Sequence, residues 1–414
     1  MDKFLSQTNQ VVKQALDLGI AQQPIGEEKI NGRSFKLGGK EVLNFGSCSY
    51  LGLELDQRIS DAAIEAIHKF GVHFSSSRCY TYVPLYDQIE ERLEKIYGKP
   101  ALYAQTTTNA HRAAMNVLLD VKNDAVILDQ QVHASVTMNI MQMIPSGLHV
   151  EKIKHSNMEK LEEKIIELSQ KFEKVWYMAD GVFSMYGDMT PAEELVKLVK
   201  KYPQLHLYID DAHGIAVGGK NGVGCYLEKT GGYHERLILA GSMGKGPGVG
   251  GGFVIFETQE QKELALNVGS FFAGPVQNPV LGGAVAVLDI MASDEIHEFQ
   301  DRLKQRIHHF QKLCKELDLP LVGLDETPIF FIGVGQDEIA TKIGAELKEE
   351  GFYTNLSVYP NVPLGRAGIR ITVSNHLQLE DIENLLRTVS KKLNENIEKE
   401  GYTVADIRKR FRIA

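Results

Sequence analysis

The sequence predicts an α/β fold, with a mostly parallel central sheet flanked by helices and a smaller C-terminal α+β domain. From about residue 100, short apolar runs alternate with segments of helical spacing, which is typical of βαβ units. Near residue 285 this pattern gives way to a long helical stretch followed by short strands and helices. We therefore expect an N-terminal helix and hairpin segment over 1–50, a large domain over 51–285 and a small domain over 286–414.

Hydrophobic periodicity assigns the individual elements in chain order. Residues 1–20 are expected to form an amphipathic helix, 33–45 a β-hairpin around Gly38 and Gly39, and 56–70 and 85–97 two further helices. The predicted strands of the large domain are 101–103, 125–128, 175–178, 205–209, 237–240 and 252–256. The rest of the chain is expected to contain one helical stretch over 278–317, strands at 329–334, 351–354 and 368–373, and helices at 339–350, 379–399 and 404–414.

The composition limits the class of protein. With 43% hydrophobic and 24% charged residues, the 414-residue chain is typical of a globular protein with a substantial core. A net charge of −9 argues against a general nucleic-acid binder, which would present a basic face. No apolar run approaches the ~20 residues that cross a bilayer, and the first residues lack the apolar centre of a signal peptide. The four scattered cysteines fit neither a metal nor a disulfide pattern. We expect a cytoplasmic protein with free thiols and no metal.

A glycine-rich turn carrying Lys245 lies between the strands predicted at 237–240 and 252–256. Glycines let a backbone approach a ligand closely, and the turn's N–H groups and the Ser242 hydroxyl suit an anion. A lysine in such a turn can contact a phosphate, or form a Schiff base with a carbonyl cofactor once it is desolvated. Taken alone, Lys245 is more often a solvated loop residue. Its meaning depends on the other strand ends.

Polar side chains follow four of the predicted strands, where ligands bind in a doubly wound sheet. Thr107 and Thr108 open a helix and could bind an anion or serve only as caps. His133 could stack on a flat ring or be a structural histidine. Asp180 and Asp188, after the strand predicted at 175–178, could simply cap and shape a turn. Asp210 could pair with a protonated ring nitrogen, with His213 in acid–base work. Asp210 and His213 could equally be a metal pair, although no third ligand is evident.

Taken in order, these motifs resemble the α-oxoamine synthases, which are fold-type I enzymes dependent on pyridoxal phosphate (PLP). The resemblance extends from about Val42 to Leu386 and is carried by a set of short motifs. These are Asn44-Phe-Gly-Ser-Cys-Ser-Tyr-Leu-Gly-Leu53, Ser76-Ser-Arg78, Asp129-Gln-Gln-Val-His-Ala-Ser135, Phe183-Ser-Met-Tyr-Gly-Asp188, Asp210-Asp-Ala-His213, Gly241-Ser-Met-Gly-Lys245 and Val362-Pro-Leu-Gly365 followed by Ile369-Arg370.

The resemblance implies a role for each cofactor residue. Lys245 would hold PLP covalently and later move the substrate α-proton. Asp210 would pair with the pyridine nitrogen, and His133 would stack on the ring face. His213 would bond the ring's phenolic oxygen, and the phosphate would be bound by Ser242, Thr107 and Thr108.

The substrate residues implied by the resemblance are Arg370, Ser184 and Cys48. Arg370 would bind the amino-acid carboxylate through a bidentate fork, a geometry that suits arginine. Cys48 and His111 both stand where the family has asparagine. The cofactor residues are therefore retained while the substrate surroundings are altered.

The implied reaction condenses an amino acid with an acyl thioester, carried by CoA or an acyl carrier protein, usually with loss of CO₂, to give an α-amino ketone. Family members are homodimers with shared active sites, so we expect a homodimer that binds small molecules and neither nucleic acid nor a membrane span. Aminotransfer or another fold-type I reaction would use the same Lys245, Asp210 and Arg370. A non-catalytic member is disfavoured, because a scaffold alone has no need for a lysine in a tight glycine turn.

Overall fold

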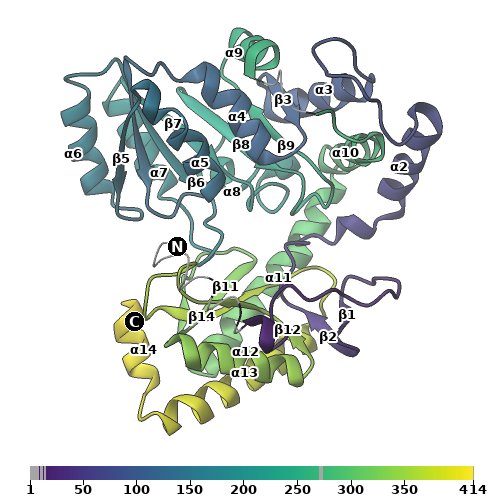
Figure 1. The fold of residues 1–414 in the computed structure, drawn as a ribbon, viewed down its shortest axis with the longest axis vertical. Coiled ribbons are helices and arrows are strands. Elements are labelled where there is room, and N and C mark those ends of the chain that lie inside the picture. Colours follow the sequence, from purple (N-terminus) through teal and green to yellow (C-terminus); the bar gives the residue numbers. More distant parts are fainter. Residues whose placement is uncertain (1–8, 10–12, 14, 270–273, 414) are drawn as a thin grey trace. The chain divides into compact units, whose positions relative to one another are not determined.

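The computed structural model describes residue 9, residue 13 and residues 15–269 and 274–413. The chain divides into two compact units (Figure 1). Unit 1 comprises residues 1–52, 185–188 and 301–414, and unit 2 comprises 53–184 and 189–300. Most of the helix predicted for residues 1–20 falls outside the described residues.

Unit 2 is built on a seven-stranded sheet with strand order β3-β9-β8-β7-β6-β4-β5. All neighbouring strands pair in parallel except β9, which is antiparallel to both β3 and β8. The mostly parallel sheet predicted from the sequence is therefore confirmed. Its strands are β3 (Ala101–Ala104), β4 (Asp124–Asp129), β5 (His149–Ile153), β6 (Lys174–Asp180), β7 (Leu205–Asp210), β8 (Leu237–Ser242) and β9 (Gly252–Ile255).

The central strands are apolar along their whole length because helices cover the sheet (Figure 1). On one face, the buried side chains of α4 (Thr107–Leu118) and α5 (Ala134–Met141) form one core with alternate residues of the strands, such as Val126, Trp176 and Tyr208. The other helices of unit 2 are α2 (Gln57–Phe70), α3 (Leu85–Tyr97), α6 (Met158–Leu168), α7 (Ala192–Lys201), α8 (Cys225–Thr230), α9 (Gln259–Leu264) and α10 (Asn278–Met291).

The single helical stretch predicted over 278–317 is wrong, because the structure has two helices there. α10 ends at Met291, and α11 (Glu295–Glu316) begins after three intervening residues. The Ser293 hydroxyl donates a hydrogen bond to the Ile290 carbonyl and accepts one from the Glu295 N–H. A serine that bonds to nearby backbone in this way competes with continued helix.

Unit 1 holds two small sheets and three C-terminal helices. One sheet, β10-β11-β14-β13, is antiparallel throughout. In the other, β1 and β2 form the predicted hairpin, with Gly38 and Gly39 at positive φ in its two-residue turn. The strands of these two sheets and the three C-terminal helices of unit 1 are β1 (Ser34–Leu37), β2 (Lys40–Asn44), β10 (Leu321–Val322), β11 (Ile329–Gly335), β12 (Phe352–Tyr353), β13 (Asn355–Ser357), β14 (Ala367–Thr372), α12 (Asp337–Glu349), α13 (Leu379–Lys399) and α14 (Val404–Phe411).

The predicted N-terminal segment 1–50 does not stand apart in the structure. Strand β2 pairs in parallel with β12, more than 300 residues further along the chain, and the segment lies within unit 1. Strands β5, β10 and β13 were not predicted, because they are short or carry too many polar residues to show an apolar run.

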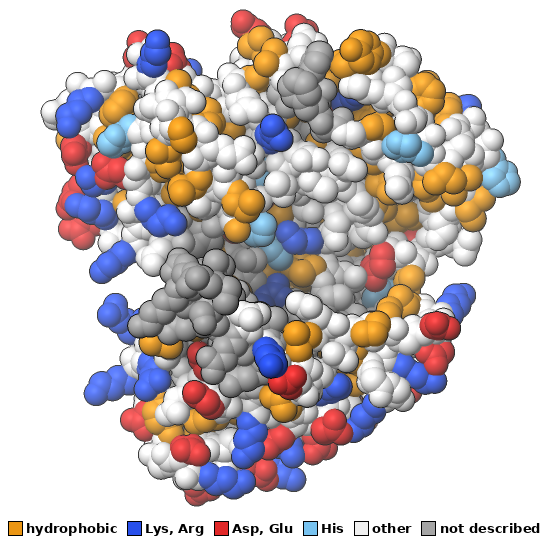
Figure 2. All heavy atoms as spheres, viewed as in Figure 1, with side chains coloured by type: hydrophobic (Ala, Val, Ile, Leu, Met, Phe, Trp, Pro, Cys, Tyr) orange, Lys and Arg blue, Asp and Glu red, His pale blue; other side chains and the backbone are white. Residues whose placement is uncertain are grey.

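The surfaces of the two units differ in the face shown in Figure 2. Acidic and basic side chains are interspersed over unit 1, whereas hydrophobic side chains reach the surface at several places on unit 2. Within the described ranges, no helix is both long and apolar enough to span a bilayer.

Candidate active site

A cavity of about 290 Å³ opens at the carboxyl ends of the strands in unit 2. Its walls come from the segments that follow β3, β4, β7 and β8. The sequence singled out these strand ends and also that of β6, whose following residues do not line the cavity. The lining residues are Thr106, Thr107, Thr108, His133, Ser135, Asp210, Ala212, Ser242, Gly244, Lys245 and Gly251. The structure thus brings six predicted site residues together: Lys245, Asp210, His133, Ser242, Thr107 and Thr108.

Four other predicted site residues do not line this cavity. His213 follows Asp210 by three positions in the chain and is buried. Ser184 is the last residue of the segment 53–184 of unit 2. Arg370 and Cys48 belong to unit 1, where they lie near each other. The Arg370 Nη1 donates to Asn355 Oδ1 at 2.9 Å, and its Nη2 lies 3.9 Å from the Cys48 sulfur.

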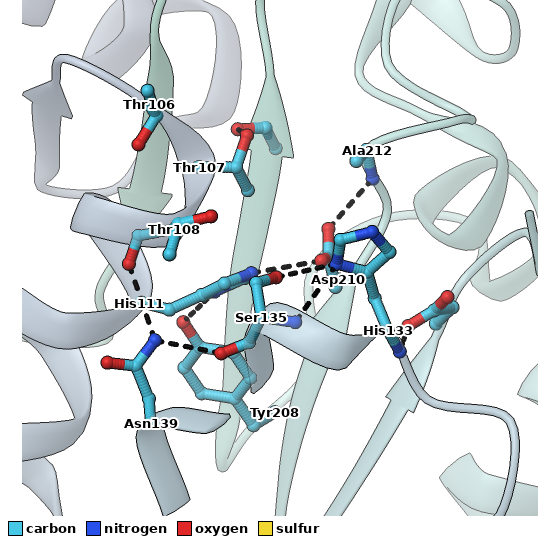
Figure 3. Close-up of polar contacts among 12 residues, drawn as sticks. Thr106, Thr107, Thr108, His111, His133, Ser135, Asn139, Tyr208, Asp210 and Ala212 are labelled. Atoms are coloured by element: carbon cyan, nitrogen blue, oxygen red, sulfur yellow. Dashed lines mark hydrogen bonds and ion pairs between the residues drawn. The ribbon is translucent and has the colours of Figure 1, made fainter. Parts of the chain in front are cut away.

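The N-terminus of α4 forms one end of the cavity (Figure 3). The Thr106 hydroxyl caps the helix by accepting the Asn109 N–H. The N–H groups of Thr107 and Thr108, the first two residues of the helix, have no acceptor within it and can bind a ligand. Asn139 of α5 donates to the Thr108 carbonyl at 3.4 Å and so ties this turn to the neighbouring helix. Gly252 permits the close approach of β9, because a Cβ there would lie 2.3 Å from the Thr107 nitrogen. A helix N-terminus with hydroxyls beside it suits a phosphate.

Asp210, at the end of β7, supplies a buried negative charge. Its Oδ1 accepts the Ala212 N–H at 3.1 Å, and its Oδ2 lies 3.0 Å from His111 Nε2 (Figure 3). Burial raises the pKa of Asp210, but the charge and hydrogen bond of His111, together with Lys245 and His133, more than offset this. The pKa is lowered to about 2, so the carboxylate is ionised at neutral pH.

His133 caps α5, and its ring faces the cavity as a neutral imidazole. The Ser135 N–H donates to Nδ1 at 3.2 Å, and the Ser135 hydroxyl lies 2.6 Å from the same nitrogen. Nδ1 is therefore the acceptor and Nε2 carries the proton. Burial lowers the pKa of His133, and the nearby Lys245 amine lowers it further, although Asp210 opposes them. A flat, uncharged ring in this place suits stacking.

Lys245 lies in the turn between β8 and β9, and the backbone on its C-terminal side takes a path that only glycine permits. A Cβ at Gly246 would lie 2.3 Å from the Ile215 carbonyl oxygen, and Gly248 has a φ of +78°. The Gly248 N–H closes the turn on the Lys245 carbonyl at 3.0 Å. Ser242, just before it, accepts the Gly244 N–H through its hydroxyl. The glycines are therefore required to bring the amine and this hydroxyl to the same cavity.

The sequence did not reveal the functional setting of His111, Tyr208 and Asp180. His111 was noted only as a departure from a family asparagine, and Asp180 was interpreted as a turn residue. All three are buried, and they are linked to cavity residues: His111 bonds Asp210, Tyr208 bonds His111, and Asp180 accepts the His133 N–H. The available signal was a histidine on the apolar face of α4, one helical turn after Thr107. The described residues contain no group of three potential metal ligands.

The fold and the cavity define a PLP-dependent transferase of fold type I. The chain belongs to the aminotransferase class I and II family, whose model matches residues 40–389. A relative from Thermoanaerobacter pseudethanolicus, an 8-amino-7-oxononanoate synthase, is 31% identical over 383 residues, which are 91% of this chain and 93% of the relative. The predicted α-oxoamine synthase resemblance is thereby confirmed.

Solved structures give the same fold. A variant of serine palmitoyltransferase from S. paucimobilis with a bound PLP–myriocin aldimine has a TM-score of 0.85 and 23% identity, covering 95% of this chain and 98% of its own. An 8-amino-7-oxononanoate synthase from Francisella tularensis has a TM-score of 0.73 and 24% identity, covering 86% and 98%. At these identities the likeness concerns the fold.

The residues of the cavity fit PLP. The ionised Asp210 matches a protonated pyridine nitrogen, the α4 N-terminus matches the phosphate, and the Lys245 amine matches the aldehyde. When bound there, PLP supplies an electron sink for a carbanion at the substrate α-carbon.

Proposed function

We propose that this enzyme condenses an amino acid with an acyl thioester, releasing the thiol and usually CO₂, to form an α-amino ketone. The observation that carries the proposal is the single cavity in which an amine, an ionised carboxylate, a neutral imidazole and a helix N-terminus meet. The 8-amino-7-oxononanoate synthases among the relatives support the reaction class.

Each residue of the cavity then has one task. The Lys245 amine binds the cofactor and afterwards takes and returns the proton at the substrate α-carbon. The Asp210 carboxylate holds the proton of the pyridine nitrogen. His133 packs its neutral ring against the cofactor, and Ser242 with Thr107 and Thr108 binds the phosphate.

In unit 1, we propose that Arg370 binds the carboxylate of the amino acid, with Cys48 beside it. Support comes from the contact of the guanidinium with Asn355 and from its approach to the Cys48 sulfur. A thiol in place of an amide leaves only a weak hydrogen-bond donor at this position in the substrate's surroundings. His213 and Ser184 stay predictions that depend on the family pattern alone.

We further propose that the enzyme is a cytoplasmic homodimer with shared active sites. Exposed apolar side chains of unit 2, on the segment before α3 and on or just after α5, support the dimer; they are Val72, Phe74, Tyr80, Tyr82, Met138, Met141 and Ile144. All four cysteines are free thiols, as expected in a reducing compartment. Light scattering of the purified protein should give twice the chain mass; a catalytically active monomer would contradict the shared site.

The test of the reaction is thiol release. The holoenzyme is incubated with a panel of amino acids and acyl-CoA or acyl carrier protein thioesters, and free thiol is measured with a chromogenic disulfide. We expect thiol release that requires both substrates. Absence of thiol release across the panel, with amino transfer to a keto acid instead, would establish the aminotransferase alternative. The Lys245→Ala protein serves as the blank for uncatalysed thioester hydrolysis.

A further inference from the structure

We propose that His111 is a positioning residue that holds Asp210 ionised and oriented toward the cofactor, as the middle member of a buried relay Tyr208–His111–Asp210. The inference rests on the proposed role of Asp210 and concerns how this chain, with histidine in place of the family's asparagine, supports that carboxylate. None of these three side chains contacts bulk water, since each is at most 3% exposed.

The geometry of the relay comes from two elements. His111 lies one turn into α4, and Tyr208 and Asp210 lie on the same face of β7 because they are two residues apart. His111 Nδ1 is 2.8 Å from the Tyr208 hydroxyl, and its Nε2 is 3.0 Å from Asp210 Oδ2 (Figure 3). Both imidazole nitrogens are therefore occupied, and the ring cannot turn without losing two buried hydrogen bonds.

The contacts fix the direction of the hydrogen bond between His111 and Asp210. An ionised carboxylate only accepts, so His111 Nε2 must carry a proton and donate it to Asp210. Burial, then the charge of Asp210, raises the pKa of the Tyr208 hydroxyl well above its usual range, so that the phenol keeps its proton. The Tyr208 hydroxyl is thus the partner of Nδ1, and this hydrogen bond holds the ring with Nε2 facing Asp210. With the Ala212 N–H on Oδ1, both oxygens of Asp210 are fixed from behind.

The neighbouring strand shows what happens to a carboxylate without such a donor. Asp180 is paired with Asp210 across β6 and β7 and is equally buried. It accepts a backbone N–H from His133 at 2.9 Å. Burial and the charge of Asp210 raise the pKa of Asp180 well above its usual range. Asp210 is just as buried, but the charge and hydrogen bond of His111, and then the charge of Lys245, lower its pKa. The contact with His111 is the one that Asp180 lacks.

The test compares His111→Ala, His111→Asn and Tyr208→Phe with wild type. The dissociation constant of PLP is measured by titrating the apoprotein, and the visible absorbance of each holoenzyme is followed against pH. A hydrogen bond to a charged group is worth about 1.5–3 kcal/mol, so His111→Ala should weaken PLP binding by about tenfold or more and move the absorbance transition. His111→Asn, which keeps one N–H donor, should recover part of the loss. Tyr208→Phe should have a smaller effect of the same kind.

His206→Asn is the matched control, because His206 also lies on β7 but its ring bonds to the Gln204 carbonyl, away from the cavity. The His206→Asn protein should keep the wild-type PLP affinity and spectrum.

If His111 had only a structural role, His111→Ala would lower the melting temperature without moving the absorbance transition, and His111→Asn would not recover PLP affinity. That result overturns the proposal. So does a His111→Ala protein with wild-type affinity and spectrum. If His111→Ala does not fold, the asparagine and Tyr208 variants decide by the same readouts. The dissociation constant of PLP tests this inference separately from the proposed reaction, because it can be measured even if the wild-type enzyme releases no thiol.

Discussion

Asp180 and Asp210 are paired neighbours on the parallel strands β6 and β7, and they take opposite ionisation states. The pKa of Asp180 is raised by burial and by the charge of Asp210, whereas the pKa of Asp210 is lowered to about 2 despite burial, through His111 and Lys245. Two carboxylates that share a buried site cannot both ionise cheaply, so one proton is retained by the pair.

This asymmetry predicts that the two asparagine variants behave differently. Asp180→Asn replaces a neutral acid with a neutral amide and should keep PLP binding and most activity. Asp210→Asn removes the charge that faces the pyridine nitrogen and should lower kcat by about a hundredfold, a common size for loss of one preorganised electrostatic partner. Steady-state kinetics on both proteins check this; equal losses would contradict the assignment.

Lys245 is predicted to be the residue that PLP modifies. Wild-type protein should be yellow, and borohydride should fix the cofactor to the peptide that contains Lys245. Lys245→Ala should lose both the reducible absorbance and the reaction, because no other amine among the described cavity residues faces the aldehyde. Absorbance spectroscopy and peptide mass mapping give the result. Label on a different lysine would refute the site.

Thr107 is predicted to act on the phosphate of the cofactor. Thr107→Val keeps the shape of the side chain but removes a hydroxyl that now donates weakly to the Gly241 carbonyl at 3.4 Å. PLP affinity should fall by about tenfold, the value of one hydrogen bond to a charged group. Pyridoxal, which lacks the phosphate, is the matched ligand and should bind both proteins equally. Equal losses for the two ligands would mean that Thr107 only supports the helix.

Arg370 is predicted to recognise the carboxylate of the amino acid. Arg370→Lys keeps the charge but loses the two-pronged geometry, so KM for the amino acid should rise by about tenfold or more while KM for the acyl thioester stays constant. Initial rates with each substrate varied in turn test this. A rise confined to the KM for the acyl thioester would show that Arg370 binds the thioester and not the amino acid.

Asp211 makes the stability of the protein depend on pH. Burial, opposed by the Tyr226 N–H, raises its pKa from 3.8 to about 8 in the folded protein. The folded state therefore holds a proton that the unfolded chain releases above about pH 4, and the stability from the protonated acid is lost as pH rises toward 8. Asp211→Asn removes this dependence. The free energy of unfolding of Asp211→Asn minus that of wild type should grow from pH 5 to pH 8 and then level off. Urea titrations of both proteins at each pH measure this difference. A difference that does not change with pH would mean that Asp211 is ionised throughout.

The sequence by itself determined the sheet and most of the polar residues of the cavity, because both depend on local signals. Apolar runs mark buried strands, and the glycines around Lys245 mark a backbone that no other residue permits. The polar residues after four strands meet because parallel strands end at one edge of a sheet. The family motifs add the assignment to PLP.

Only the tertiary structure decided how the charges at that edge are arranged. Asp180 and Asp210 look alike in the sequence, and His111 looks like one more residue on the face of a helix. The ionisation of the two carboxylates depends on neighbours that are distant in the chain. His111 contacts Asp210 from 99 positions away, and Asp180 is paired with Asp210 across β6 and β7, 30 positions away. Electrostatic interaction follows distance in space, which a linear sequence does not record.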